Sequence, residues 1–276
     1  MKKEETTKIV REGYAKVARQ GSSCCAPSDT CCGSTVKAED ISKVVGYSEE
    51  ELASVPDAAN MGLGCGNPVA IASLKEGETV IDLGSGGGLD CFLAAAKVGI
   101  SGRVIGIDMT PEMLEKAREN ARRGNYVNVE FRLGEIENLP VADNTGNVII
   151  SNCVINLSPD KKRVFSEAFR VLKPGGRIMI SDIALKKDLP DFLKDSIDAY
   201  ISCLSGAIKK DEYLSAVRDA GFQDVEIIEE RVFSLDCYSD DPIAKAVLDN
   251  SKITLEQLRD VADTIVSIKV SGVKTC

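Results

Sequence analysis

The chain has 276 residues, of which 43% are hydrophobic, and it carries a formal net charge of −9. This is enough apolar material for one domain with a sizeable core and smaller extensions. No lysine or arginine cluster stands out, so nucleic acid is not an expected partner. No apolar stretch has the length needed to cross a membrane, and the charged N-terminus lacks a secretory core. We therefore expect a cytoplasmic protein, with a monomer as the default state.

Two residue counts restrict the chemistry. The chain has ten cysteines and no histidine. Because cytosolic cysteines stay mostly reduced, we expect free thiols rather than a disulfide framework. Without histidine, serine–histidine and cysteine–histidine couples and histidine-ligated metal sites are excluded. Any reaction must therefore depend on thiols, carboxylates, amines or the substrate itself.

The N-terminal part predicts helices joined by loops. Apolar spacing over residues 1–20 predicts a helix, and the small, polar residues 21–36 predict a loop. Ser48 followed by Glu51 predicts a capping box at a helix start. Residues 60–68 predict a glycine-rich turn.

From residue 78 onward, apolar strands alternate with helical segments, which is typical of a parallel, doubly wound sheet. The expected strands are 78–83, 103–108, 128–132, 147–151, 177–182, 224–229 and 263–270. The expected helices are 89–99, 111–123, 160–172 and 190–221. We predict an α/β fold with a doubly wound, seven-stranded, mostly parallel sheet. Residues 1–67 form an N-terminal helical and loop extension, 68–235 the main domain, and 236–276 a C-terminal α+β appendage that completes the sheet and covers the substrate side.

The segment TVIDLGSGGG at residues 79–88 carries the strongest functional signal. It reads as a buried strand followed by a glycine-rich turn at a helix start, where backbone approaches a ligand closely. The dinucleotide fingerprint is incomplete, because its third glycine position is Leu89. Asp108 ends the next strand, where a carboxylate suits a ribose diol. The pattern predicts an adenosine-type cofactor at the carboxyl end of the first strand.

Three runs together resemble class I S-adenosylmethionine-dependent methyltransferases: Asp82 to Gly88, Ile107 to Met109, and Ala168 to Arg177. The resemblance covers roughly residues 68–235 and implies S-adenosylmethionine as the cofactor. The expected cofactor contacts are Asp82, Gly84, Ser85, Gly86, Asp108, Met109, Glu135, Ile136 and Asn152. Of these, Glu135 and Ile136 are expected along the adenine, and Asn152 near the methionine end of the cofactor.

Three solitary cysteines lie in informative contexts. Cys153 follows the fourth strand, at the sheet edge where doubly wound folds bind ligands. Cys65 on a glycine-flanked turn and Cys203 in a helical segment can reach the same edge. Cys91 is expected to be only a small buried hydrophobe. The strings LGCGNP, ISNCVINLS and SCLSGA closely resemble arsenite S-adenosylmethionine methyltransferases, which implies that Cys65, Cys153 and Cys203 bind trivalent arsenic.

The implied chemistry suits a chain without histidine. Soft thiolates bind soft metalloids, and three sulfurs leave the arsenic lone pair free to attack the sulfonium methyl in line. The product is pentavalent, so thiols must reduce it, with thioredoxin or glutathione as the final reductant. Cys24 and Cys25 are the candidates to exchange with Cys65, and the second pair, Cys31 and Cys32, competes for that role. Cys237 and Cys276 receive no role.

Two other functions remain possible from the sequence. A small-molecule C- or O-methyltransferase of the quinone-biosynthesis type shares the glycine turn and the run Lys173 to Gly176. That chemistry calls for an acid or base in an apolar pocket, which a chain with 5% aromatic residues and no histidine supports poorly. A protein that only sequesters metalloid leaves the cofactor turn unexplained.

Overall fold

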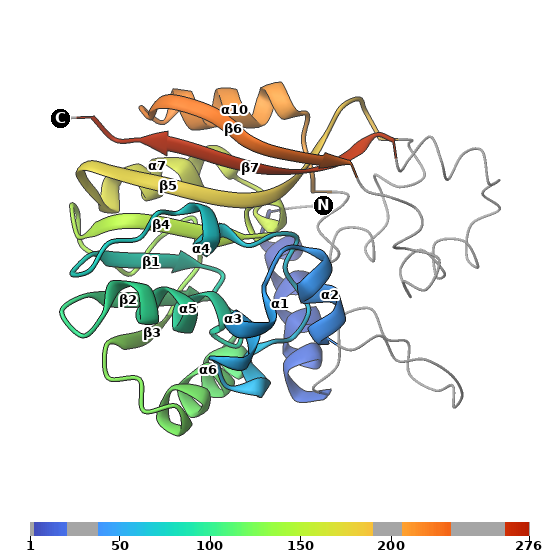
Figure 1. The fold of residues 1–276 in the computed structure, drawn as a ribbon. Helices are drawn as coiled ribbons and strands as arrows, with labels where there is room; N and C mark the ends of the chain where they lie inside the picture. Colours follow the sequence, from blue (N-terminus) through green and yellow to red (C-terminus); the bar gives the residue numbers. More distant parts are fainter. Residues whose placement is uncertain (1–2, 21–37, 190–205, 233–262, 276) are drawn as a thin grey trace, which may run out of the picture.

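The computed structural model describes residues 3–20, 38–189, 206–232 and 263–275 (Figure 1). Within them one seven-stranded sheet has the order β3-β2-β1-β4-β5-β7-β6. The strands are β1 (Thr79–Leu83), β2 (Arg103–Asp108), β3 (Val129–Leu133), β4 (Gly146–Asn152), β5 (Leu172–Leu185), β6 (Gln223–Val232) and β7 (Ile265–Val273). Pairs among β1 to β5 are parallel, whereas β7 runs antiparallel between β5 and β6. The predicted doubly wound, mostly parallel sheet is confirmed.

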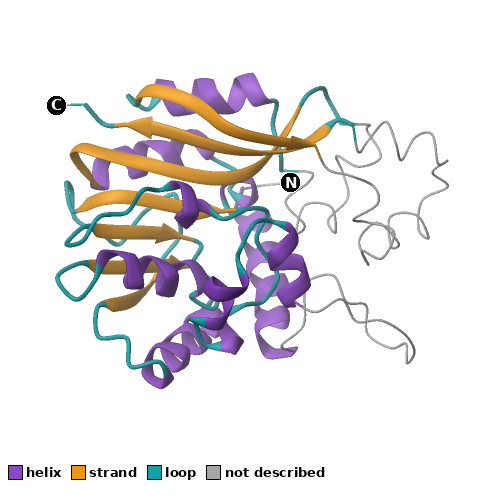
Figure 2. Ribbon diagram, in the orientation of Figure 1, coloured by secondary structure: helices purple, strands orange, loops and turns teal. Residues whose placement is uncertain are grey.

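Helices cover both faces of this sheet (Figure 2). They are α1 (Lys3–Gln20), α2 (Ala38–Val44), α3 (Glu49–Ala53), η1 (Asp57–Ala59), α4 (Pro68–Ile71), α5 (Leu89–Val98), α6 (Pro111–Arg123), η2 (Ile155–Leu157), α7 (Lys161–Val171) and α10 (Lys210–Asp219). The first predicted helix is confirmed, and the helical segment predicted at 190–221 is helical at α10, whereas residues 206–209 are not helical. Residues 190–205 lie outside the described residues.

The sheet is buried on both faces because successive strand residues alternate between two apolar layers. Val80 and its neighbours on one face pack against α5 and α6. Ile81, on the opposite face, belongs to the layer under α7 and α10. Because both faces are buried, the central strands have near-continuous apolar sequences. These apolar runs allowed the strands to be predicted from the sequence.

The strands β5 and β6 extend well beyond their predicted bounds. β5 begins at Leu172, five residues before the expected start, because Leu172 already pairs with Gly146 across an irregular register. It continues to Leu185 along the antiparallel ladder with β7. β6 likewise extends to Val232 on the other side of β7. Cross-strand pairing, which no local pattern records, sets these lengths.

The N-terminal helices lie beside the carboxyl ends of the parallel strands (Figure 1). The predicted capping box is present: the Glu51 N–H donates to Ser48 Oγ (3.1 Å), and the Ser48 N–H donates to Glu51 Oε2 (3.0 Å). An ion pair between Arg19 and Glu112 joins α1 to α6. Among the described helices, none is both long and apolar enough to span a membrane.

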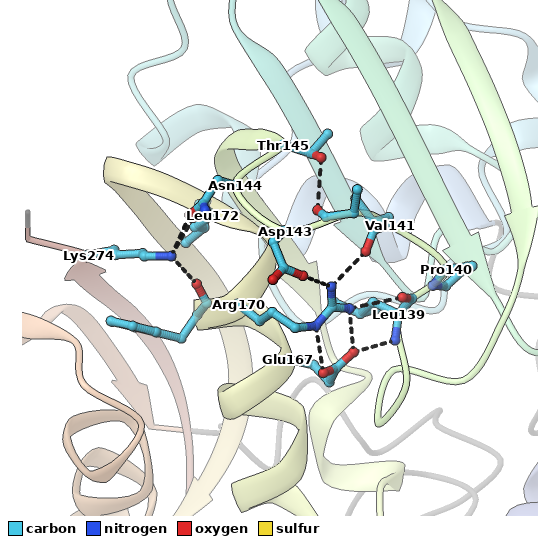
Figure 3. A network of polar contacts seen from close by, with 12 residues as sticks. Leu139, Pro140, Val141, Asp143, Asn144, Thr145, Glu167, Arg170, Leu172 and Lys274 are labelled. Atoms are coloured by element: carbon cyan, nitrogen blue, oxygen red, sulfur yellow. Dashed lines mark hydrogen bonds and ion pairs between the residues drawn. The ribbon is translucent and has the colours of Figure 1, made fainter.

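A polar network fixes α7 to the loop before β4 (Figure 3). Arg170 donates to both oxygens of Glu167 (2.9 and 2.7 Å) and to Asp143 (2.6 Å). The buried Glu167 carboxylate also accepts the Leu139 N–H (2.8 Å). The guanidinium of Arg170 lowers the pKa of Glu167 below its ordinary value. This network stabilises the fold and contacts no predicted site residue.

Candidate cofactor and thiol site

A cavity lies at the carboxyl end of the parallel strands, between the sheet edge and the N-terminal helices. Eight of the nine predicted cofactor residues line it: Asp82, Gly84, Ser85, Gly86, Asp108, Met109, Ile136 and Asn152. Glu135 does not, since it is exposed and lines a different surface depression, while Glu137 lines the cavity. Tyr14 of α1 also reaches this cavity. One concave site therefore collects residues from several predicted motifs.

The glycine turn after β1 is held close to the end of β2. The N–H groups of Gly84 and Ser85 both donate to the Ile107 carbonyl (2.8 and 3.0 Å). Gly84 has φ of +72°, and a Cβ there would lie 2.5 Å from Val154 Cγ2. Glycine is therefore required at this position both by backbone conformation and by space.

Asp108 lies where the sequence predicted a ribose-binding carboxylate. Its Oδ2 accepts the Gly86 N–H (2.9 Å), and its Oδ1 accepts the Thr110 N–H (2.8 Å). Burial nevertheless raises its pKa above the ordinary value. A carboxylate has about four lone-pair sites, so both oxygens retain capacity for further donors. The backbone thus orients a carboxylate that lines the cavity and is able to accept two hydroxyl groups.

The charges around the cavity all have one sign. Its lining contains four carboxyl groups, from Asp82, Asp90, Asp108 and Glu137, and no lysine or arginine among the described residues. Burial raises the pKa of Asp90 to about 6, and it raises that of Asp82 as well. An acidic cavity favours a ligand that carries positive charge and disfavours phosphate groups.

Asn152 connects this cavity with the cysteine-bearing turn. Its side-chain Nδ2 donates to the Gly66 carbonyl (2.7 Å), to Tyr47 Oη (2.8 Å) and to Asp90 Oδ2 (3.1 Å). Its Oδ1 accepts the Cys65 N–H (3.0 Å). Asn152 was predicted from the sequence as a site residue, whereas Tyr47 and Asp90 were not. The sequence signal that could have identified Asp90 is its position as the second residue of α5, close behind the glycine-rich turn.

Cys65 and Cys153 are disulfide-bonded, with Cα atoms 5.7 Å apart, although 88 residues separate them. Both are buried. The expectation of free thiols is therefore wrong for this pair, because their Cα separation lies within the usual disulfide range. Cys91 matches its prediction as a buried free thiol, and it donates to Asp82 Oδ2 (3.1 Å). The remaining candidates, Cys24, Cys25, Cys31, Cys32 and Cys203, lie outside the described residues.

Local backbone explains how the two cysteines meet. Cys153 has φ of +58°, a conformation uncommon for residues other than glycine, and its N–H donates to the Ser181 carbonyl (2.8 Å). Opposite it, the Cys65 turn packs directly on the strand ends. A Cβ on Gly66 would lie 1.9 Å from Ser181 Oγ, and one on Gly64 would lie 2.6 Å from Asn152 Nδ2. The glycines that flank Cys65 are therefore what allow it to reach Cys153.

This fold and this cavity are those of a class I methyltransferase. A family model described as "Methyltransferase domain" matches residues 74–221, more than half of the chain, and the chain belongs to that family.

Within the family, the chain is similar to arsenite methyltransferases, as the cysteine strings indicated. It is 50% identical to one from Halobacterium salinarum over 231 residues, covering 81% of this chain and 59% of that protein. It is 38% identical to one from Aquipseudomonas alcaligenes, covering 82% of this chain and 64% of that protein. The chain thus spans about three fifths of the length of these relatives.

A solved structure supports the same likeness. The arsenic(III) S-adenosylmethionine methyltransferase of Chlamydomonas reinhardtii matches with a TM-score of 0.61 at 32% identity. The match covers 88% of this chain and 75% of the other.

Proposed function

We propose that this chain transfers a methyl group from S-adenosylmethionine to trivalent arsenic, with arsenite as the first substrate. The observation that carries the proposal is the meeting of Cys65 and Cys153 beside the acidic cavity. The two sulfurs come from distant parts of the sequence, and both residues were predicted to bind arsenic. Cys203 is the third proposed thiolate.

The cavity fits this cofactor. S-adenosylmethionine supplies an electrophilic methyl group on a positively charged sulfonium. Four carboxyl groups without a described lysine or arginine suit its positive charges. Asp108 is the proposed acceptor for the ribose hydroxyls, and Gly84 to Gly86 are the proposed backbone wall that approaches the cofactor. Asp82 and Asn152 remain the proposed contacts at the methionine end.

The thiolates have three tasks in this proposal. They displace the hydroxyl groups of arsenous acid, they fix arsenic at one position, and they leave its lone pair directed at the methyl group. Cys153 lines the cofactor cavity, so arsenic bound to it lies on the side from which attack is needed. Because arsenic is itself the nucleophile, the reaction requires no general base, which accords with a chain that lacks histidine.

Reduction completes the cycle. Methyl transfer leaves pentavalent arsenic, and two electrons from a pair of thiols return it to the trivalent state as those thiols become a disulfide. We propose Cys65 with one cysteine of the N-terminal pairs Cys24–Cys25 or Cys31–Cys32 for this role. A thiol reductant of the thioredoxin or glutathione class then restores the thiols.

The test is a methylation assay with labelled S-adenosylmethionine, a thiol reductant and arsenite. Cys153→Ser and Cys203→Ser are each expected to abolish methylated arsenic while cofactor binding persists. Cys276→Ser serves as the matched control and is expected to retain activity. Cys65→Ser is expected to lose the first methylation but to keep activity on methylarsenite, which requires only two thiolates. Full activity of both Cys153→Ser and Cys203→Ser contradicts the proposal.

The same assay separates the alternatives. A sequestering protein binds arsenite tightly but yields no methylated product. A quinone-type methyltransferase binds the cofactor but leaves arsenite unmodified, whatever the state of Cys153.

A further inference from the structure

A third potential ligand lies beside the two bonded sulfurs. Asp182, on β5, is fully buried. One of its carboxylate oxygens and the sulfurs of Cys65 and Cys153 all lie within 4.8 Å of one another. The three side chains come from the 62–67 turn, the end of β4 and the middle of β5. Three different segments therefore converge on one buried point.

The groups that contact Asp182 directly are uncharged hydrogen-bond donors. Its Oδ1 accepts hydrogen bonds from Asn156 Nδ2 (2.8 Å) and the Ile183 N–H (2.9 Å), and its Oδ2 accepts one from Tyr213 Oη (3.0 Å). All three donors are neutral. The charge of Lys161, whose Nζ donates to the Asn156 carbonyl (3.3 Å), also acts on this carboxylate. A buried carboxylate is costly to ionise, and a directly bound cation offsets that cost, whereas arsenic in the proposed site is already neutralised by three thiolates.

We propose that the reduced Cys65–Cys153 pair and Asp182 form a binding site for a thiophilic divalent cation of the zinc class. Zinc binds sulfur at about 2.3 Å and carboxylate oxygen at about 2.0–2.2 Å, so ligand atoms around one tetrahedral ion lie roughly 3.6–3.8 Å apart. The present separations of up to 4.8 Å require only small movements once the disulfide is reduced. Two thiols lose their protons to solvent on binding, and the fourth position remains open to water or another ligand.

The site has two consequences. A divalent cation and trivalent arsenic need the same two sulfurs, so each excludes the other. Without the cation, oxidised glutathione converts the two thiolates to the disulfide and is itself reduced to two glutathione thiolates. A bound cation occupies both thiolates and therefore slows this oxidation. The competition rests on the proposed function, whereas the cation site itself does not. Asp182 distinguishes the two ligands, because only the cation needs it.

Cadmium is the probe, since thiolate binding gives it an ultraviolet charge-transfer band. The reduced full-length chain is titrated with cadmium chloride without oxygen, in a background where the N-terminal pairs are replaced by serine: Cys24, Cys25, Cys31 and Cys32. Asp182→Asn and Cys65→Ser are each expected to weaken cadmium binding at least tenfold. Asp188→Asn, which alters an exposed carboxylate paired with Lys209, is the control and is expected to change nothing.

A second variant protects the test against misfolding of Asp182→Asn. Asp182→Cys places a third sulfur at the site, so the band per bound cadmium is expected to rise by one thiolate. If Asp182→Asn binds cadmium with the same affinity as the parent, the proposed cation site is wrong. It is also wrong if folded Asp182→Cys shows the same charge-transfer absorbance per bound cadmium as the parent. Arsenite is expected to displace cadmium. If it does not, the claim that both ligands bind the same two sulfurs is refuted. If the chain binds cadmium through Asp182 but does not methylate arsenite, only the proposed function fails.

Discussion

Asn152→Ala is the sharpest test of how the fold brings Cys65 and Cys153 together. The substitution removes the acceptor of the Cys65 N–H and the donor to the Gly66 carbonyl. These two backbone groups belong to consecutive buried residues. Each group left without a partner costs roughly 1–3 kcal/mol, so we expect the free energy of unfolding to fall by about 2–6 kcal/mol. The loss is concentrated in the turn that carries Cys65.

The loosened turn is expected to hold the two sulfurs together less well. If about 1.4 kcal/mol of the loss acts on their relative position, the equilibrium constant for forming the disulfide falls about tenfold. Glutathione redox titration of the Cys65–Cys153 pair measures this constant, and urea unfolding of the reduced protein measures the stability. Cofactor binding by Asn152→Ala, measured in parallel, tests the separate prediction that this residue contacts the methionine end.

The matched control is Asn147→Ala at the opposite end of the same strand. The Asn147 amide oxygen accepts the Thr79 N–H (3.0 Å) and a hydrogen bond from Lys173 (3.0 Å), so its loss also destabilises the sheet. It lies far along β4 from the thiols and is expected to leave the disulfide equilibrium unchanged. Equal redox constants for the two variants would show that Asn152 does not position the sulfurs.

Two further predictions follow from contacts described above. Gly66→Ala places a Cβ 1.9 Å from Ser181 Oγ, so we expect a loss of about 1–3 kcal/mol in unfolding free energy and little Cys65–Cys153 disulfide. Gly272→Ala, whose Cβ meets only ordinary contacts from 3.4 Å, is the control, and similar results for both argue against close packing of the turn. Glu167→Gln weakens the charged contact with Arg170 and is expected to cost about 1–3 kcal/mol at neutral pH. Because the pKa of Glu167 is lowered in the folded state, this stability is complete above its ordinary value of 4.5 and is lost as pH falls through the lowered value. Urea unfolding across that range should therefore show the two proteins converging in acid, and a constant gap refutes the assignment.

Much of the central fold could be predicted from local pattern. The strands at Thr79–Leu83 and Arg103–Asp108 are apolar on both faces and end in polar or glycine residues, so their place in a buried parallel sheet was readable. The extent of β5 was not, because residues beyond Asp182 are strand only through pairing with β7.

The candidate site divides in the same way. Gly84 and Asp108 have local signatures, since a turn and a strand end dictate their roles. Glu135 was predicted and Glu137 was not, because the sequence locates the loop after β3 but does not give the direction of each side chain in it. Asp182 gave no signal, since an acid within an apolar strand acquires meaning only from what folds against it.

The position of β7 has a consequence for synthesis of the protein. The strand β7 inserts between β5 and β6, both of which precede it in the sequence. Among the described strands, β5 also pairs with β4, whereas β6 pairs with β7 alone. Until residue 273 has left the ribosome, β5 presents an open hydrogen-bonding edge and β6 has no neighbour. Nascent chains are therefore exposed to strand exchange with one another during the interval between synthesis of β5 and synthesis of β7.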